Sequence, residues 1–115
     1  MPKVMLLMKR KPGFSLAEFK DYYERNHAPL AKRLLGRFML DYRRSYRSGG
    51  IATEVTDAPE GDDFDVITEI WYADQASMDA MWEHARKPEI AAEIDADGAK
   101  FMDPEMRFYV VEECR

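Results

Sequence analysis

The amino-acid sequence predicts an α+β fold in which helices cover one face of a four-stranded antiparallel sheet. Four short segments have the apolar or alternating pattern of strands, and segments with helical periodicity separate the first from the second and the third from the fourth. A chain of 115 residues with 46% hydrophobic residues has the size of one ordinary domain. We therefore expect residues 1–115 to form a single domain.

The first two elements are expected to be a strand and a long helix. Residues 4–8 are continuously apolar, as in a strand buried on both faces. Ser15 and Glu18 have the spacing of a capping box, in which each side chain accepts the other residue's backbone N–H. We therefore expect a helix over residues 16–35, ended by Gly36.

His27 interrupts the apolar face of this helix. At about 100° per residue, that face consists of Leu16, Phe19, Tyr23, His27, Leu30 and Leu34. Pro29 lacks a backbone N–H, so the helix should kink or stop beside His27. Two interpretations stay open: a core histidine bonded to the carbonyl that Pro29 leaves free, or an acid/base group, since imidazole titrates near neutral pH.

Two further strands are expected, separated by an acidic segment. Residues 37–46 alternate Phe38, Leu40 and Tyr42 with polar residues, which is the period of a half-buried strand. Residues 64–72 are rich in β-branched and aromatic residues and predict another strand. Residues 51–63 are acidic and rich in turn formers, and we expect them to be the most mobile part of the chain.

Two shorter helices should follow. Asp74 or Ser77 can cap a helix that includes the apolar residues of 78–85. Pro88 suits the first turn of the next helix, and Gly98 can end it.

With a last strand at residues 108–111, the order becomes strand, helix, strand, strand, two helices, strand. This is the split β-α-β pattern of ferredoxin-like folds, with the helices on one face of the sheet. The first and third strands have apolar or aromatic residues on both faces, so the second face of the sheet should be buried too. A homodimer packed sheet to sheet is the simplest way to bury it.

Composition argues against several kinds of partner. The net charge of −5 and the scattered basic residues argue against nucleic acid. Cys114 is the only cysteine, so neither a disulfide within the chain nor a cysteine-based zinc site can form. Two histidines, no recognisable ligand spacing and no glycine-rich fingerprint predict neither metal nor cofactor. The short apolar N-terminus is neither a signal peptide nor a membrane span, so we expect a cytoplasmic protein without a membrane partner.

Three charged features need an interpretation. Arg43, Arg44 and Arg47 either form the solvated end of a strand, where they meet acidic residues of neighbouring elements, or bind a phosphate or carboxylate. Glu69 lies within an apolar strand: it must either find an arginine or a hydroxyl across the dimer or, if buried unpaired, stay protonated, and we favour a structural pairing. His84 should be solvated.

Several blocks of the sequence occur in a specific order. They are residues 6–15 (LLMKRKPGFS), Phe19, residues 22–23 (YY), 26–30 (NHAPL), 69–72 (EIWY), 101–103 (FMD) and 108–113 (FYVVEE). Together they resemble the EthD family of the dimeric α/β-barrel superfamily. The resemblance implies that two ferredoxin-like protomers pack their sheets into one barrel with the helices outside. It also implies relatives that dehydrate aromatic polyketides, cyclise them or act as cofactor-independent monooxygenases.

The reactions of such relatives start from an acidic carbon or a phenol in an apolar pocket, so they require a proton acceptor and no metal. We expect His27 to be the acid/base group, with Tyr23 one turn before it on the same helix face. Asp103 is either a turn residue before a proline or the carboxylate that orients the His27 ring.

Aromatic and amide side chains are the candidates for substrate binding. They are Tyr22, Asn26, Tyr42, Trp71, Trp82 and Phe101. Each aromatic residue can also be an ordinary core or interface residue.

Two functional hypotheses follow. The first is a small cofactor-independent enzyme of oxidative or polyketide-type metabolism, monooxygenase-, dehydratase- or cyclase-like, that acts on an aromatic or hydrophobic small molecule with His27 as acid/base. The alternative is a noncatalytic hydrophobic-ligand-binding or accessory protein of an oxygenase pathway. An enzyme requires His27 at a pocket wall with an orienting partner within hydrogen-bond reach, whereas a binding protein requires only the pocket.

Overall fold

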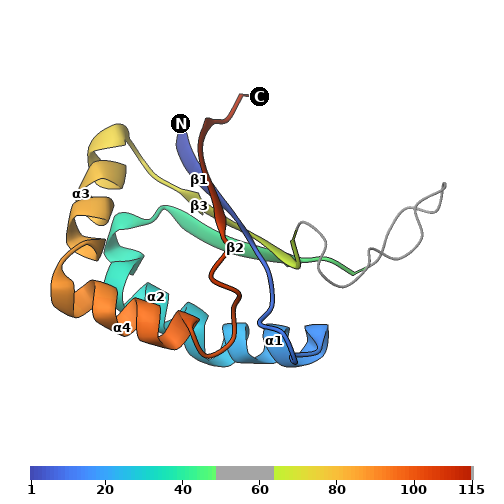
Figure 1. Ribbon diagram of the computed structural model, residues 1–115. Helices are drawn as coiled ribbons and strands as arrows, with labels where there is room; N and C mark the ends of the chain where they lie inside the picture. Colours follow the sequence, from blue (N-terminus) through green and yellow to red (C-terminus); the bar gives the residue numbers. More distant parts are fainter. Residues whose placement is uncertain (49–63, 115) are drawn as a thin grey trace.

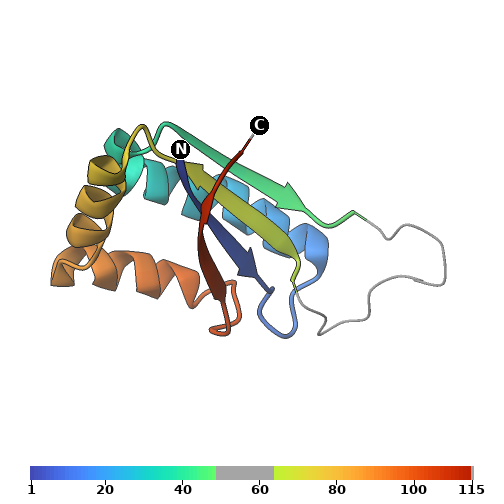
Figure 2. The ribbon, with the colours of Figure 1, turned by 90° about the horizontal axis from the view of Figure 1, so that it is seen from above.

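The computed structural model of the chain describes residues 1–48 and 64–114. The strands of this part form one antiparallel sheet in the order β2-β3-β1-β4, seen from above in Figure 2. They are β1 (Pro2–Met8), β2 (Asp41–Tyr46), β3 (Val66–Trp71) and β4 (Arg107–Glu112). The acidic segment expected to be mobile, residues 51–63, lies outside the described residues.

The helices lie on one face of this sheet (Figure 1). They are α1 (Leu16–Tyr22), α2 (Ala28–Leu35), α3 (Gln75–Ala85) and α4 (Pro88–Gly98). The ferredoxin-like α+β fold predicted from the sequence is confirmed. Ser15 and Glu18 form the expected capping box, and Asp74 caps α3 by accepting the backbone N–H of Ser77.

The helix around His27 continues where the sequence predicted a kink or a stop. Tyr23–His27 is a π-helical segment that joins α1 directly to α2. The N–H of Ala28 bonds to the carbonyl of Tyr23, five residues earlier. A π-helical turn shifts the bonding pattern by one residue, so the chain accommodates the missing N–H of Pro29 without ending the helix.

The second strand begins at Asp41 rather than at Arg37. A 3₁₀ turn, Gly36–Phe38, follows α2, and the N–H of Met39 bonds to the carbonyl of Gly36. Phe38 packs against the core next to α3, whereas Leu40, expected to be buried, is 59% exposed. The alternation read from the sequence was therefore not that of one continuous strand.

The core lies between the sheet and the helices. Val4 and Val66 point toward the helices and are fully buried. The buried residues form two clusters, one around Tyr72 and one around Phe19 and Phe101. The cavity described below is lined by members of both clusters.

The opposite face of the sheet, here called the open face, is not covered by any described helix (Figure 1). In β1 and β3 it consists of Lys3, Met5, Leu7, Ile67, Glu69 and Trp71. Lys3 forms ion pairs with Glu69 and, at 3.2 Å, with Glu113, to which the indole of Trp71 donates at 3.0 Å. Glu69 is paired, as predicted, but its partner is Lys3 of the same chain rather than an arginine or a hydroxyl across a dimer.

Candidate functional site

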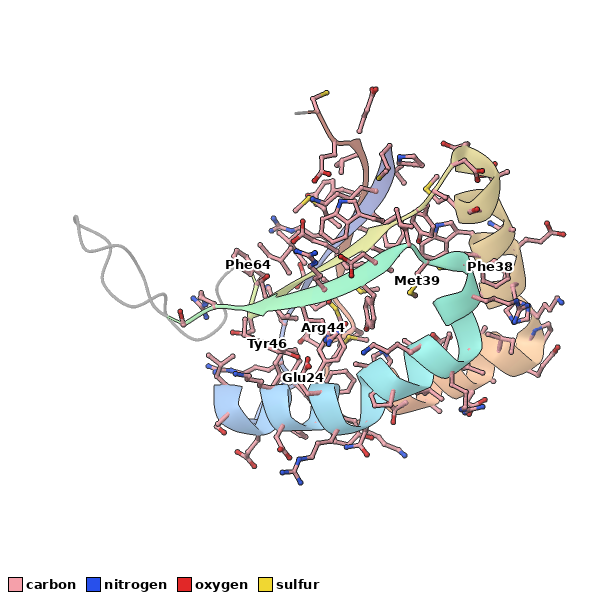
Figure 3. The ribbon with its side chains drawn as sticks, turned by 180° about the vertical axis from the view of Figure 1, so that it is seen from behind. Glu24, Phe38, Met39, Arg44, Tyr46 and Phe64 are labelled. Atoms are coloured by element: carbon pink, nitrogen blue, oxygen red, sulfur yellow. The ribbon has the colours of Figure 1, made fainter. Side chains whose placement is uncertain are left out.

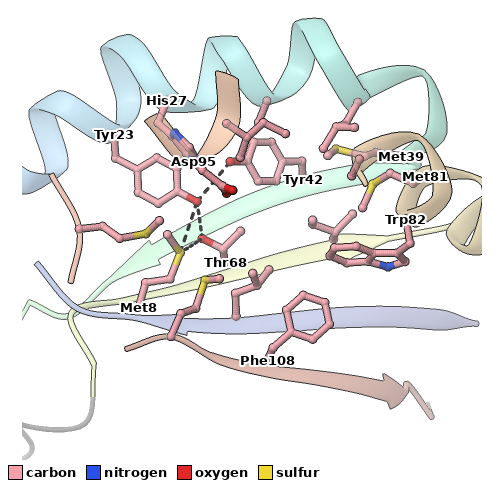
Figure 4. A pocket seen from close by; sticks show the side chains of 18 of the residues that line it. Met8, Tyr23, His27, Met39, Tyr42, Thr68, Met81, Trp82, Asp95 and Phe108 are labelled. Carbon is pink, nitrogen blue, oxygen red and sulfur yellow. Dashed lines mark hydrogen bonds between the residues drawn. The ribbon is translucent and has the colours of Figure 1, made fainter. Parts of the chain in front are cut away.

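A cavity of about 330 Å³ lies between the helices and the sheet (Figure 4). Every strand of the sheet and the surrounding helices contribute to its lining, which is mainly apolar. The lining includes five methionines, namely Met8, Met39, Met81, Met102 and Met106. The polar side chains are few: Tyr23, His27, Tyr42, Thr68 and Asp95.

His27 is held at the cavity wall by a carboxylate of α4. Its Nδ1 lies 2.9 Å from Oδ2 of Asp97, and the hydroxyl of Tyr22 donates to Oδ1 of the same carboxylate at 2.7 Å. The ring is 7% exposed and packs against Phe101, with ring centres 5.0 Å apart. Tyr23, at the other end of the π-helical segment, also lines the cavity, as is common for functional residues in such segments.

These contacts determine which nitrogen of His27 carries the proton. A carboxylate offers only acceptors, so Nδ1 donates to Asp97 and Nε2 of the neutral ring has the lone pair. Burial, together with the neighbouring carboxylate, raises the pKa of Tyr22 to about 12, so its phenol keeps the proton that it donates. Among the described residues no group bonds to Nε2, and this atom is not sealed off from solvent. Nε2 is therefore the nitrogen of His27 to which no described residue bonds, on a side chain that lines the cavity.

A chain of hydroxyl groups lies beside His27 in the cavity (Figure 4). Tyr42 donates to the hydroxyl of Tyr23 at 3.2 Å, and the side-chain oxygens of Tyr23 and Thr68 are 2.7 Å apart. Thr68 donates in turn to the sulfur of Met8 at 3.6 Å. Burial raises the pKa of Tyr23 well above its ordinary value, so this phenol stays neutral. This chain of hydroxyl groups can form hydrogen bonds with a ligand but does not supply a second base.

A charged cluster next to β2 supports Tyr42 (Figure 3). Glu24 accepts hydrogen bonds from Arg44 at 2.6 and 3.0 Å and from Tyr46 at 2.6 Å. The guanidinium of Arg44 lies 4.6 Å from the centre of the Tyr42 ring, and its hydrogen bonds lower the pKa of Glu24. The arginines of residues 43–47 thus meet acidic residues, as the strand-end interpretation predicted. Only Arg43 is solvated as expected, however, because the side chains of Arg44 and Arg47 are largely buried.

Of the nine residues proposed from the sequence, four line the cavity and five do not. Those that line it are Tyr23, His27, Tyr42 and Trp82. Those that do not line it are Tyr22, Asn26, Trp71, Phe101 and Asp103.

The first four of the residues outside the cavity have different positions. Tyr22 is turned toward Asp97, and Asn26 lines a separate surface hollow next to that carboxylate. Phe101 is fully buried behind the cavity wall, where it packs against the His27 ring. Trp71 lies on the open face because it belongs to the other alternate set of β3 residues.

Asp103 does not orient His27. Its carboxylate accepts the backbone N–H of Glu105 at 2.8 Å, so the turn interpretation is correct. The orienting carboxylate is Asp97, which the sequence did not reveal. Asp97 follows the apolar residues of α4 at helical spacing, and this break in the pattern was the available signal. Thr68 and the methionines of the cavity were not foreseen either.

Other possible sites are not supported in residues 1–48 and 64–114. No group of three or more His, Cys, Asp or Glu side chains in these residues could hold a metal ion. No helix among them combines the length and the apolar character that crossing a membrane requires. His84, expected to be solvated, lies beside Phe38 with ring centres 5.5 Å apart.

Most of the chain matches one protein family. The profile of the EthD domain matches residues 11–105. The chain belongs to the EthD family. The matched range includes His27, Asp97 and the tyrosines and threonine of the hydroxyl chain. A comparison with curated proteins gave no match.

Solved structures share the fold of this EthD-family chain. An ethyl tert-butyl ether D family protein from Bacillus halodurans has a TM-score of 0.67 and 22% identity, and the match covers 99% of this chain and 100% of that one. A dimeric protein of unknown function from Bacteroides fragilis has a TM-score of 0.58 and 10% identity, with 97% and 95% covered. A putative antibiotic biosynthesis monooxygenase from Nitrosomonas europaea has a TM-score of 0.57 and 10% identity, with 100% of both chains covered. At these identities the likeness shows the fold alone.

Proposed function

We propose that this chain is a small cofactor-independent enzyme of oxidative or polyketide-type metabolism, monooxygenase-, dehydratase- or cyclase-like, that acts on an aromatic or hydrophobic small molecule. His27 is its acid/base group. The observation that carries the proposal is Nε2 of His27, to which no described residue bonds, on a side chain that lines an apolar cavity, with Asp97 bonded to Nδ1. A histidine that only filled the core would have both nitrogens bonded, as buried polar groups normally are.

The tautomer of His27 defines the proton transfer. Nε2 takes a proton from an acidic C–H or O–H bond of the ligand, whose electron pair stays on the ligand as an enolate or phenolate. Asp97 stabilises the imidazolium that results. Return of the proton to another carbon gives an isomerised product, and its transfer to a departing hydroxyl group gives water and completes a dehydration.

The environment of the cavity favours this chemistry. A ligand that fills this mainly apolar, methionine-rich cavity displaces water from around the reacting atoms, which strengthens electrostatic interactions there. The fold shared with a putative antibiotic biosynthesis monooxygenase supports an oxidative variant of the reaction by analogy.

The test is hydrogen–deuterium exchange of 2-tetralone, a two-ring ketone with acidic C–H bonds, followed by proton NMR in heavy water. The wild-type chain should accelerate the exchange. His27→Ala should lower the rate by about 10²–10⁴-fold, the usual contribution of an acid/base group, while leaving the circular dichroism spectrum intact. His84→Ala removes the other histidine, which does not line the cavity, and should leave the rate unchanged.

Equal exchange rates for wild type and His27→Ala would exclude the acid/base role. Binding of 2-tetralone without any exchange would favour the noncatalytic alternative, a hydrophobic-ligand-binding or accessory protein.

We also propose that two copies of the chain pack open face to open face. Met5, Leu7 and Ile67 are apolar side chains on this face, which has no described helix above it. The related Bacteroides fragilis protein, which is described as dimeric, supports this arrangement. An obligate interface of this kind should bury more than about 2,000 Å² in total. Light scattering should give a dimer mass, and a monomer mass at micromolar concentration would contradict the proposal.

A further inference from the structure

The cavity has no positive side chain to receive an anionic ligand. No lysine or arginine is among the described residues that line it. Arg44 lies against the Tyr42 ring, but both carboxylate oxygens of Glu24 already bind its guanidinium. A carboxylate or phosphate inside the cavity would lose its hydration without gaining a cation, which is costly.

Asp95 adds a negative charge where the cavity opens. It lines the cavity (Figure 4) and also an adjoining surface hollow that includes Met102 and Met106. Asp95 is exposed, and its carboxylate has no hydrogen-bond or ion-pair partner among the residues that the structure describes. A free carboxylate at an opening repels anions and accepts hydrogen bonds from uncharged donors.

His27 sets a second requirement for the ligand. Because Nδ1 donates to Asp97, Nε2 presents a lone pair to the cavity. The ligand atom next to it must therefore carry an acidic hydrogen. A hydroxyl group satisfies this requirement, whereas an ionised carboxylate does not.

The volume of the cavity sets the size of the ligand. A protein cavity of about 150 Å³ holds benzene. The cavity next to His27 has about 330 Å³, roughly twice that volume, which corresponds to about two fused rings.

We propose that the cavity binds an uncharged, hydroxyl-bearing compound of about two fused rings, and that Asp95 is the residue that excludes carboxylates. This inference rests on the proposed function in that it uses the same cavity and the same nitrogen of His27. It concerns ligand selection alone and requires no turnover.

The experiment compares 2-naphthol with 2-naphthoic acid by isothermal titration calorimetry of the full chain at neutral pH. The two compounds share a ring system, but the first is neutral and the second is ionised. Wild type should bind 2-naphthol about tenfold or more tightly than 2-naphthoate. 2-Methoxynaphthalene, which lacks the hydroxyl hydrogen, should bind several-fold more weakly than 2-naphthol.

Two variants assign the selectivity to one residue. Asp95→Asn removes the carboxylate with little change in size, so it should strengthen 2-naphthoate binding several-fold and reduce the preference for 2-naphthol. Glu89→Gln removes the same charge from an exposed position of α4 that does not line the cavity, and it should change neither affinity.

Three results would overturn the proposal. Equal affinity of wild type for 2-naphthol and 2-naphthoate would remove the charge selectivity. An equal gain in 2-naphthoate binding for Glu89→Gln and Asp95→Asn would assign the effect to net charge instead of Asp95. Absence of 2-naphthol binding would exclude the ligand class. Proton exchange from 2-tetralone is measured separately, so a failure of the proposed catalysis remains distinguishable.

Discussion

The two faces of the sheet differ in the kind of polar side chain that they present. Toward the helices, Tyr42 and Thr68 present neutral hydroxyls that join Tyr23 in the cavity wall. Toward the open side, Lys3 and Glu69 present charges that neutralise each other. Strand β3 shows the contrast between neighbouring residues, because Thr68 and Glu69 belong to opposite faces.

This difference shows where reactive groups remain available. On the open face, Glu69 and Glu113 surround Lys3, and the hydrogen bond that Lys3 donates to Glu69 raises the pKa of this lysine. On the helix side, Nε2 of His27 and the carboxylate of Asp95 have no bonded partner among the described residues. Polar groups without partners in an otherwise satisfied structure are the ones available to a ligand.

The largest effect is expected from a new charge on the open face. Leu7→Lys should abolish cooperative folding rather than release a folded monomer, because a lysine would be buried without a partner in the proposed interface. Circular dichroism measures whether the variant folds, and light scattering measures whether it is a monomer. Ala80→Lys, on the exposed side of α3, should change neither. A well-folded Leu7→Lys monomer would show that the open face needs no cover.

On the helix side, Asp97→Asn tests the tautomer of His27. The amide of asparagine can donate to Nδ1, which favours the ring with its proton on Nε2 and removes the base. Exchange of 2-tetralone should fall by about 10²-fold or more. Nitrogen-15 NMR should show the proton moving from Nδ1 to Nε2. Asp103→Asn is the control, since Asp103 bonds to a turn, and it should leave the nitrogen signals unchanged; unchanged signals in Asp97→Asn would contradict the orienting role.

A pair of substitutions compares the two faces in stability. Lys3→Met leaves Glu69 and Glu113 without their shared cation and should lower the unfolding free energy by about 2 kcal/mol, short of the ~3–5 kcal/mol for a fully buried pair. Thr68→Val removes one hydroxyl from the chain beside Tyr23 and should cost about 1 kcal/mol. Urea denaturation measures both values. A larger loss for Thr68→Val would reverse this ranking of the faces.

The smallest effect is expected in acid. Hydrogen bonds from Arg44 hold the pKa of Glu24 in the folded chain below its ordinary value of 4.5. The ion pair therefore contributes its full stabilisation above pH 4.5 and loses it as the pH falls through the pKa that Glu24 has in the folded chain. Because Glu24 is partly exposed, we expect less than about 1 kcal/mol. Glu24→Gln should therefore differ from wild type in urea midpoint at neutral pH and converge with it in acid. A constant separation at every pH would exclude this ion pair as the cause.

The fold was predictable because each element has a local signal. The capping box at Ser15 and Glu18, the cap at Asp74 and the apolar run of β1 act within a few residues of the element that they define. The start of β2 was not predictable in this way, because the 3₁₀ turn after Gly36 depends on packing against α3.

The site was predictable only in part. His27 stood out because it interrupts a long apolar stripe. Its partner Asp97 lies 70 residues away on α4, whose apolar face is shorter, and only the tertiary structure brings the two side chains together. Trp71 was misplaced for a related reason: alternation along a strand defines two faces but does not say which of them the helices cover.

The π-helical segment Tyr23–His27 makes the site separable from the scaffold. A π turn contains one residue more than the α turn that it replaces. Removing one residue would therefore let α1 and α2 keep the same faces toward the sheet, joined by ordinary α-helical hydrogen bonds. Deletion of Asn26 would thus preserve the helix while moving the imidazole away from Asp97.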